Sequence, residues 1–355
     1  MSDFQKKISG FFERIGMIVF TLTFFFLLVE SCTRVADIAR GNPLLGANQQ
    51  EALFENHPYL LKTPRPGAEF NRYHVNSRGF RGAEFELPKP KGTIRLLTLG
   101  GSGTWDPRNE DDETWSAQLQ RMLNERSGEE VRYEVINGGV PGYNSAESLM
   151  NFIWRGAHVD PDGVLVYQGY NDFKPNREPG FEPDYSHFRD RDASLARRIV
   201  RSSRFLYYFS RWLPQRGRLG DAYDEVTRPG IEAFSRNLRN IVVLARDRDI
   251  VPLLATYGMS VTRENHEKHP EKLDGLARHL PRLTVEGVID AHRKYNRAVR
   301  ELGELAEVPV ADVAAAVPQD FEHFGDHCHY TKKGARLVAE TLAPLVKEHL
   351  RPGPI

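Results

Sequence analysis

The chain has 355 residues, enough for one large domain or two ordinary ones. Lysine and arginine together number 48, as do aspartate and glutamate, so the chain lacks the basic excess of a general nucleic-acid-binding protein. A hydrophobic content of 40% is sufficient for a packed core.

The first predicted element is an apolar helix close to the N-terminus. Residues 15–29, IGMIVFTLTFFFLLV, include no charged side chain, and two lysines and an arginine precede them. Two phenylalanines before this segment bring it closer to the ~20 residues that a bilayer span needs. Because basic residues favour the cytoplasmic side, we expect residues 1–35 to form a cytoplasmic stub and membrane anchor. The rest of the chain would then be extracytoplasmic, on the periplasmic side in a Gram-negative bacterium.

Other interpretations of this segment stay open. The apolar core of a cleaved signal peptide spans about 7–15 residues, although no small-x-small cleavage site follows Val29. The sequence VESC, which ends at Cys32, resembles a lipoprotein cleavage box in which the glutamate fits poorly. A buried helix is the remaining interpretation.

The residues after the anchor divide into a lead-in and an α/β region. Residues 36–92 are rich in Gly, Pro and Asn, which predicts a linker and a small β-rich lead-in. From residue 93 to residue 355, apolar strand-like runs alternate with amphipathic helical ones. The predicted strands are 93–99, 131–137, 163–169, 249–258 and 308–313, and the predicted helices include 115–128, 283–306 and 332–350. This alternation predicts a three-layer α/β/α domain with a five-stranded, mostly parallel sheet.

An insertion at about residues 173–229 interrupts the alternation. Within it, residues 194–218 place apolar side chains at helical spacing among several arginines. The expected structure is a helix packed on the domain, with its basic face in solvent. A lid over the site, a surface for anionic glycan and a contact with anionic lipid headgroups are the alternatives.

The stretch LLTLGGSGTW (96–105) ends the first predicted strand at a glycine-rich turn around Ser102. A phosphate-binding P-loop would need a lysine after the glycines, and a dinucleotide-binding turn would need G-x-G-x-x-G. Neither pattern is present here. The remaining candidates are a tight structural turn and an exposed serine nucleophile, which would need a base and donors for an oxyanion.

A candidate base lies near the C-terminus, in GDHCHYTKKG (325–334). Asp326 and His329 are three residues apart, and a carboxylate near an imidazole can fix its tautomer and stabilise the imidazolium. Asp320 and His323 have the same spacing and form a rival pair. The later pair is preferred, because it directly precedes the predicted closing helix.

Candidate oxyanion donors follow the second and third predicted strands. Gly142 lies in INGGVPGYNS, where glycines free backbone N–H groups for close approach to a ligand. Asn171 lies in QGYNDF, and its amide can donate to a developing negative charge. Ligands bind parallel sheets outside the carboxyl ends of the strands, so we expect these residues to meet Ser102 there.

These stretches resemble the sequence blocks of the SGNH (GDSL-type) hydrolases, over about residues 93–350. The resemblance implies a flavodoxin-like α/β/α fold and assigns roles to five residues: Ser102 as nucleophile and backbone donor, Gly142 and Asn171 as oxyanion donors, Asp326 as orienting acid and His329 as base. The chain departs from the older signature at Gly101, where that signature has aspartate. The lead-in segment HVNSRGFRG (74–82) is similar to the segment before the sheet in membrane-linked bacterial relatives.

Several other residues are not expected to take part in catalysis. The sequence NHEKH (265–269) lacks the H-E-x-x-H spacing of metalloproteases and is expected to be a solvated charged loop. Cys328 is expected to be a packing residue, and with Cys32 so distant in sequence no disulfide framework is expected. For three aromatic residues next to candidate positions, pocket lining and simple packing stay open: Trp105, Tyr143 and Tyr170.

Together these patterns predict a serine esterase that hydrolyses O-acyl esters, with acetyl as the expected group, on a cell-surface or exported polysaccharide. The expected partners are an acylated small molecule or glycan and, through the N-terminal helix, a membrane; no nucleic acid, metal or organic cofactor is implied. Three alternatives stay open: a polysaccharide O-acyltransferase using the same site, a lipase-like enzyme with residues 194–213 at the membrane surface, and a non-catalytic glycan-binding or assembly protein on this scaffold.

Overall fold

The computed structural model describes residues 3–39, 52–125, 131–189, 203–212 and 222–351. By its internal contacts the chain divides into two compact units. The smaller unit comprises residues 1–51 and 192–216, and the larger unit comprises residues 52–191 and 217–355.

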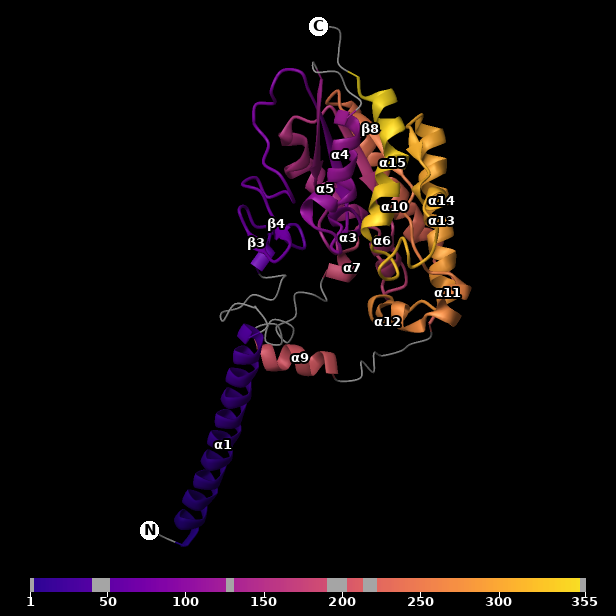
Figure 1. Ribbon diagram of the computed structural model, residues 1–355. Coiled ribbons are helices and arrows are strands. Elements are labelled where there is room, and N and C mark those ends of the chain that lie inside the picture. Colours follow the sequence, from indigo (N-terminus) through magenta and orange to yellow (C-terminus); the bar gives the residue numbers. More distant parts are fainter. Residues whose placement is uncertain (1–2, 40–51, 126–130, 190–202, 213–221, 352–355) are drawn as a thin grey trace. The chain divides into compact units, whose positions relative to one another are not determined.

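A five-stranded parallel sheet forms the centre of the larger unit (Figure 1). In spatial order its strands are β6 (Arg132–Asn137), β5 (Thr93–Gly100), β7 (Gly163–Tyr167), β8 (Val251–Ala255) and β9 (Val310–Ala311). Every residue of β5 and β7 is buried, as expected for strands that are covered on both faces. The predicted α/β class and the five predicted strands are confirmed.

Two of the predicted strands are much shorter than expected. The segment 249–258 is a strand only over β8, and the segment 308–313 only over β9. After β9 the chain turns into the short helix α14 (Val313–Ala316), because Thr256 Oγ1 donates to Asp312 and accepts from the N–H of Ala314. The apolar run therefore continues past the strand into a helical turn.

The ends of β5 and β7 meet at the centre of the sheet. Gly100, the last residue of β5, pairs with Tyr167, the last residue of β7. Since β6 lies on the other side of β5, the strand order reverses at this point. Such a reversal opens a crevice at the carboxyl edge of a doubly wound sheet, and this crevice is where ligands bind.

Helices cover both faces of the sheet. On one face α4 (Trp115–Glu125) packs against α15 (Lys332–His349), as Figure 1 shows. On the other face lie α5 (Ser145–Trp154), α10 (Arg228–Arg246) and α13 (Val285–Ala306). The helices predicted at 115–128, 283–306 and 332–350 are confirmed as α4, α13 and α15, although residues 126–128 lie outside the described residues. The remaining short helical segments of the larger unit are α3 (Ser102–Trp105), η1 (Asp111–Glu113), η2 (Gly156–Val159), α6 (Tyr170–Asn176), α7 (Ser186–Arg189), α11 (Arg263–Lys268) and α12 (Pro270–His279).

The lead-in packs against the loops that follow β5 and β6. It forms two small antiparallel ladders, β1 (Phe54–Glu55) with β2 (Thr63–Pro64) and β3 (Glu69–Phe70) with β4 (Tyr73–His74). A second hydrophobic core lies between the lead-in and the α/β region, separate from the main core around the sheet. Its buried residues are Leu53, Phe54, Leu60 and Val75 from the lead-in, and Trp105, Val140 and Tyr143 from the two loops.

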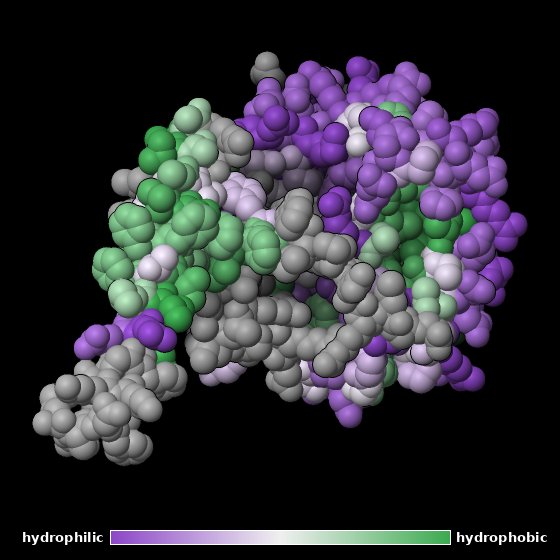
Figure 2. Space-filling view, turned by 90° about the horizontal axis from the view of Figure 1, so that it is seen from below, coloured by the Kyte–Doolittle hydropathy of each residue, from purple (hydrophilic) through white to green (hydrophobic). Residues whose placement is uncertain are grey.

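The smaller unit is built around α1 (Asp3–Ala39). Its segment Phe12–Ala36 is long and apolar enough to cross a membrane, judged by length and composition alone. Figure 2 shows the apolar side chains that gather on the surface of this helix. The second described helix of this unit is α9 (Arg204–Trp212), which confirms the helix predicted in 194–218 over these residues only.

Glu30 joins the two helices of the smaller unit. Its carboxylate accepts hydrogen bonds from the backbone N–H groups of Arg204 (3.0 Å) and Phe205 (2.9 Å) and from Oγ of Ser203 (2.8 Å). The first N–H groups of a helix have no intrahelical acceptor and carry a partial positive charge. Glu30 therefore caps α9 from the neighbouring helix.

Candidate active site

Ser102 stands at the end of β5, as the first residue of α3. Close approach explains the two glycines before it. A Cβ on Gly100 would lie 2.2 Å from the carbonyl oxygen of Tyr167, and a Cβ on Gly101 would lie 2.3 Å from Nδ2 of Asn171. Only glycine lets this turn pack directly against β7 and the loop that follows it.

Asp326 and His329 lie on the turn before α15, and this turn meets Ser102. Nε2 of His329 is 2.9 Å from Oγ of Ser102, across a sequence separation of 227 residues, and Nδ1 is 2.9 Å from Oδ2 of Asp326. Oδ1 of Asp326 accepts hydrogen bonds from the backbone N–H groups of Cys328 and His329, both at 3.0 Å, which hold the turn. With the Nδ1 proton donated to the carboxylate, Nε2 is left as the acceptor for the serine O–H.

Asn171 lies at the start of α6, after β7, and Gly142 lies on the loop that follows β6. Nδ2 of Asn171 donates to the carbonyl oxygen of Tyr143 at 2.8 Å, and it lies against the backbone of Gly101. An amide nitrogen has two hydrogens, and the bond to Tyr143 uses only one of them. Gly142 is exposed and has φ +92°, a conformation that favours glycine. The structure thus brings all five predicted residues to the carboxyl edge of the sheet.

The surroundings of Asp326 and His329 shift the pKa values of both side chains. Burial raises the pKa of the Asp326 carboxyl, but hydrogen bonds and the charge of His329 lower it more, so it lies well below its ordinary value. Burial lowers the pKa of His329, but the Cys328 sulfur and the Asp326 carboxylate outweigh burial and raise it above its ordinary value. The carboxylate therefore stays ionised and stabilises a protonated imidazole.

Asp172 is a residue of this region that the sequence interpretation missed. Its carboxylate is buried and accepts hydrogen bonds from Oγ of Ser145 (2.5 Å), Nε2 of Gln168 (2.9 Å) and the hydroxyl of Tyr185 (3.0 Å). Burial raises the pKa of Asp172 to about 6, although these donors oppose the shift. Asp172 ties the start of α6 to the start of α5 through Ser145. Its place next to Asn171 is the only signal in the sequence.

The rival pair forms a turn of its own. Nδ1 of His323 is 2.7 Å from Oδ1 of Asp320, and the same oxygen accepts the backbone N–H of His323 at 3.0 Å. Among the described residues, two groups place three possible metal-ligand atoms close together: Asp320, Glu322 and His323, and Asp326, Cys328 and His329. The second group coincides with the turn that contacts Ser102, where the carboxylate and imidazole already hold each other.

The remaining candidates have structural roles. The segment 265–269 is mostly helical rather than a loop, because Thr262 caps α11 by accepting the N–H of Asn265, and the helix has no buried residue. Three candidate side chains, Trp105, Tyr143 and Tyr170, are buried, and the first two belong to the second hydrophobic core. Cys328 is 1% exposed and packs in the main core, as predicted. Burial raises the pKa of its thiol, but His327 and His329 lower it to about 7.

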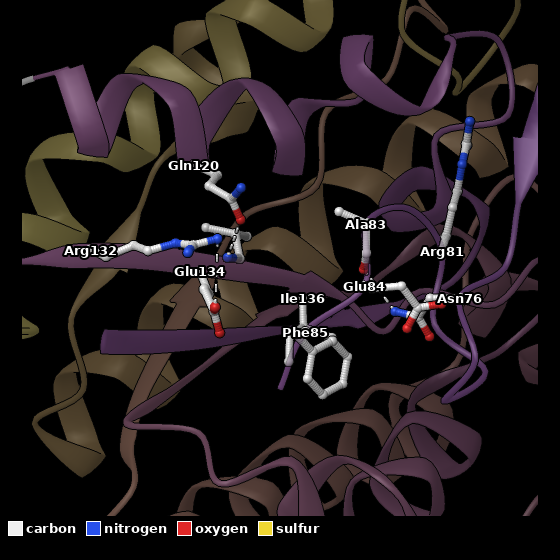
Figure 3. Close-up of a pocket in the computed structure, with 10 residues that line it drawn as sticks. Asn76, Arg81, Ala83, Glu84, Phe85, Gln120, Arg132, Glu134 and Ile136 are labelled. Atoms are coloured by element: carbon white, nitrogen blue, oxygen red, sulfur yellow. Dashed lines mark hydrogen bonds and ion pairs between the residues drawn. The ribbon is translucent and has the colours of Figure 1, made fainter. Parts of the chain in front are cut away.

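A small cavity lies away from this edge, between the lead-in, α4 and β6 (Figure 3). Its volume is about 60 Å³, and its lining includes Gln120, Arg132 and Glu134. Pockets that bind small molecules usually enclose about 300–1,000 Å³. The cavity is therefore too small for an ester substrate, and it contains neither a serine nor a histidine.

The chain is similar to one protein family and to several solved structures. The model of the GDSL-like lipase/acylhydrolase family matches residues 98–337. Among solved structures, the chain is similar to the lipase/acylhydrolase from Enterococcus faecalis, with 18% identity and a TM-score of 0.45 over 74% of this chain and 100% of that one. It is also similar to an acetyl xylan esterase, with 15% identity and a TM-score of 0.44 over 71% of this chain and 100% of that one. A psychrotrophic esterase from Pseudoalteromonas shows 13% identity and a TM-score of 0.43, over 72% of this chain and 97% of that one.

No curated protein matches the chain. The family match runs from the end of β5 into α15, so it includes Ser102, Asn171 and His329. It covers well over half of the residues. The chain therefore belongs to the GDSL-like lipase/acylhydrolase family and is an ester hydrolase.

Proposed function

We propose that this ester hydrolase works through a serine acyl-enzyme, with Ser102 as nucleophile, His329 as general base and Asp326 as the orienting acid. The observation that carries the proposal is the pair of 2.9 Å contacts that links Ser102 to His329 and His329 to Asp326. A Ser-His-Asp arrangement is recognised by such geometry, and it recurs on unrelated folds in different chain orders.

In the proposed first step, Oγ of Ser102 bonds to the ester carbonyl carbon while Nε2 of His329 takes the hydroxyl proton. The carbonyl oxygen becomes an oxyanion, which accepts hydrogen bonds from the N–H groups of Ser102 and Gly142 and from the second amide hydrogen of Asn171. His329 then returns the proton to the leaving alcohol as the C–O bond breaks. In the second half, His329 takes a proton from water, the water attacks the acyl-enzyme, and Ser102 is released with its proton restored.

The proposed substrate is an O-acyl ester, with acetyl as the expected group, on a cell-surface or exported polysaccharide. Gly142 is exposed, and Ser102, Asn171 and His329 are half-buried, so the alcohol part of a large substrate can reach the site from solvent. The proposed location supports this substrate class. The segment Phe12–Ala36 would anchor the chain in a membrane, and the basic residues before it favour an extracytoplasmic catalytic unit.

A product assay on the full-length protein in detergent tests the substrate. We expect the protein to release acetate from p-nitrophenyl acetate and from an O-acetylated polysaccharide, whether or not a deacetylated oligosaccharide is added. Acetate transfer that depends on the added oligosaccharide would instead identify an acyltransferase that uses the same residues. Faster cleavage of long-chain esters than of acetate esters would indicate a lipid, rather than a polysaccharide, as the substrate.

The pKa of His329 predicts the pH dependence of the reaction. His329 must be neutral to accept the serine proton, and its pKa is raised above the ordinary 6.5. We therefore expect kcat/KM for p-nitrophenyl acetate to rise with pH and to reach half its maximum above pH 6.5. The low pKa of Asp326 keeps this carboxylate ionised, so it adds no second rise. A half-maximum at or below pH 6.5, after correction for spontaneous hydrolysis, would contradict the prediction.

A further inference from the structure

Arg81 of the lead-in directs its guanidinium entirely at the loop that follows the Ser102 helix. Its Nη1 donates to the carbonyl oxygens of Trp105 and Asp106, the latter at 2.7 Å. Its Nη2 donates to the carbonyl oxygen of Asn109 at 2.7 Å, and its Nε pairs with Oδ1 of Asp111 at 2.7 Å. Arg81 is 4% exposed. One buried side chain thus fixes the path of residues 105–111, because the planar guanidinium requires its acceptors to lie at set positions.

Other lead-in residues hold the middle of the same loop. The hydroxyl of Tyr73 donates to the carbonyl oxygen of Pro107 at 2.6 Å, and Nη1 of Arg72 donates to that of Arg108 at 3.0 Å. The backbone N–H of His74 donates to Oδ2 of Asp111 at 2.9 Å. The backbone on which Arg108 stands is therefore held from the lead-in along its whole length.

The far side of the loop contacts the turn that carries the acid and the base. Nη1 of Arg108 is 3.2 Å from Oδ2 of Asp326, and both oxygens of this carboxylate lie within 3.0 Å of Nδ1 of His329. Nδ2 of Asn109 donates to the carbonyl oxygen of Tyr330 at 3.3 Å, one residue beyond His329. A Cβ on Gly325 would lie 1.8 Å from Nε of Arg108, so the arginine lies directly across this glycine.

We propose that Arg108 is a positioning residue, presented by the Arg81 clamp, that holds the Asp326 carboxylate in place and shares its charge with His329. The inference rests on the proposed Ser-His-Asp mechanism. In the ground state the Asp326 carboxylate accepts hydrogen bonds from an imidazole, a guanidinium and the two backbone N–H groups that hold its turn. The cation near the pair opposes protonation of His329, which keeps more of the base in its neutral form at a given pH. The lead-in thereby acts on the reaction through Arg81, which holds the loop that carries Arg108.

Charged and titratable groups from several elements act on His329 or on the residues of its turn, and their effects on the pKa of His329 must be separated from that of Arg108. Asp326, His327 and Cys328 come from its own turn, Asp106 and Arg108 from the loop after α3, Tyr170 from α6, Tyr257 from the segment after β8, and His279 from α12. Arg108 is the member of this group whose side chain is about half exposed, at 46%. It can therefore be replaced with little disturbance of the core.

The test measures how fast a fluorophosphonate labels Ser102 in the full-length protein as a function of pH. In this reaction Oγ bonds to phosphorus, fluoride leaves and His329 takes the proton, so the pH at half-maximal rate reports the base. For Arg108→Gln we expect this pH to rise by roughly half a unit, because a positive charge near the imidazolium is lost. Arg108→Lys, which keeps the positive charge, should show the same pH at half-maximal rate as the wild type.

Two further variants complete the test. Arg336→Gln on α15 removes another exposed arginine that is hydrogen-bonded to a glutamate, Glu340, and it should leave the pH at half-maximal rate unchanged. Arg81→Lys loses the planar fork, and we expect the same upward shift together with a roughly tenfold lower maximal rate. An Arg108→Gln profile that coincides with the wild type, or that moves to lower pH, overturns the inference while the mechanism stands. A wild-type protein that is not labelled at Ser102 overturns the mechanism and the inference with it.

Discussion

Ser102→Ala should lower kcat/KM for p-nitrophenyl acetate by about 10⁴-fold or more, because it removes the atom that forms the acyl-enzyme. The remaining oxyanion donors and the binding site would still provide some acceleration over water. Ser102 is half-buried, and among the described residues its Oγ has one hydrogen-bond partner, Nε2 of His329, so the variant should fold like the wild type. Thermal unfolding followed by circular dichroism would verify the fold.

Ser235 provides a matched control for this substitution. It lies on α10, where its Oγ donates to the carbonyl oxygen of Ile231 at 3.0 Å, a bond within the helix. Ser235→Ala should leave kcat/KM within about twofold of the wild type. Substantial activity in a folded Ser102→Ala protein would exclude Ser102 as the nucleophile.

Asp326→Asn should lower kcat by about 10⁴-fold with little effect on the fold, because it changes the tautomer of His329. An asparagine oxygen in place of Oδ1 can still accept the N–H groups of Cys328 and His329 that hold the turn. Its amide nitrogen would then replace Oδ2, the carboxylate oxygen nearer to Nδ1 of His329, and would be a donor there. The imidazole would carry its proton on Nε2 and could no longer accept the proton of Ser102.

The rival pair supplies the control for this prediction. Asp320 has the same spacing to His323 and makes a comparable contact of 2.7 Å to Nδ1. Asp320→Asn should therefore change the stability of that turn but leave kcat within about twofold of the wild type. If Asp320→Asn abolished activity and Asp326→Asn did not, the assignment of the acid would have to be reversed.

The parts of the fold and of the site that could be predicted are those that depend on residues close together in the sequence. The apolar runs of β5 and β7 are continuous, so each strand was visible without knowledge of its partners. Ser102 and Asn171 follow these two strands directly. The rule that parallel strands present their ends at one edge then brought the two residues together. The spacing of Asp326 and His329 is equally local, and the family resemblance supplied their link to Ser102.

The parts that could not be predicted depend on contacts with atoms that carry no sequence signal. Arg81 bonds to backbone carbonyl oxygens 24 to 28 residues away, and every residue has such an oxygen. The start of α10 reads Arg-Pro-Gly, which resembles a loop, although a proline in the first turn suits a helix. The C-terminal boundary of β9 was misplaced because Val313 continues the apolar pattern of the strand while the backbone turns at Asp312.

The second hydrophobic core determines where this chain can be cut. A fragment that began at the first residue of β5 would keep the whole sheet and all five candidate residues, and by sequence alone it looks like a complete domain. It would nevertheless expose Trp105, Val140 and Tyr143, which the lead-in covers in the intact protein. These apolar side chains stand on the segments that carry Ser102 and Gly142, so their exposure would disturb the candidate active site before it disturbed the sheet. The compact unit that holds the candidate site therefore begins some forty residues before β5, at about residue 52.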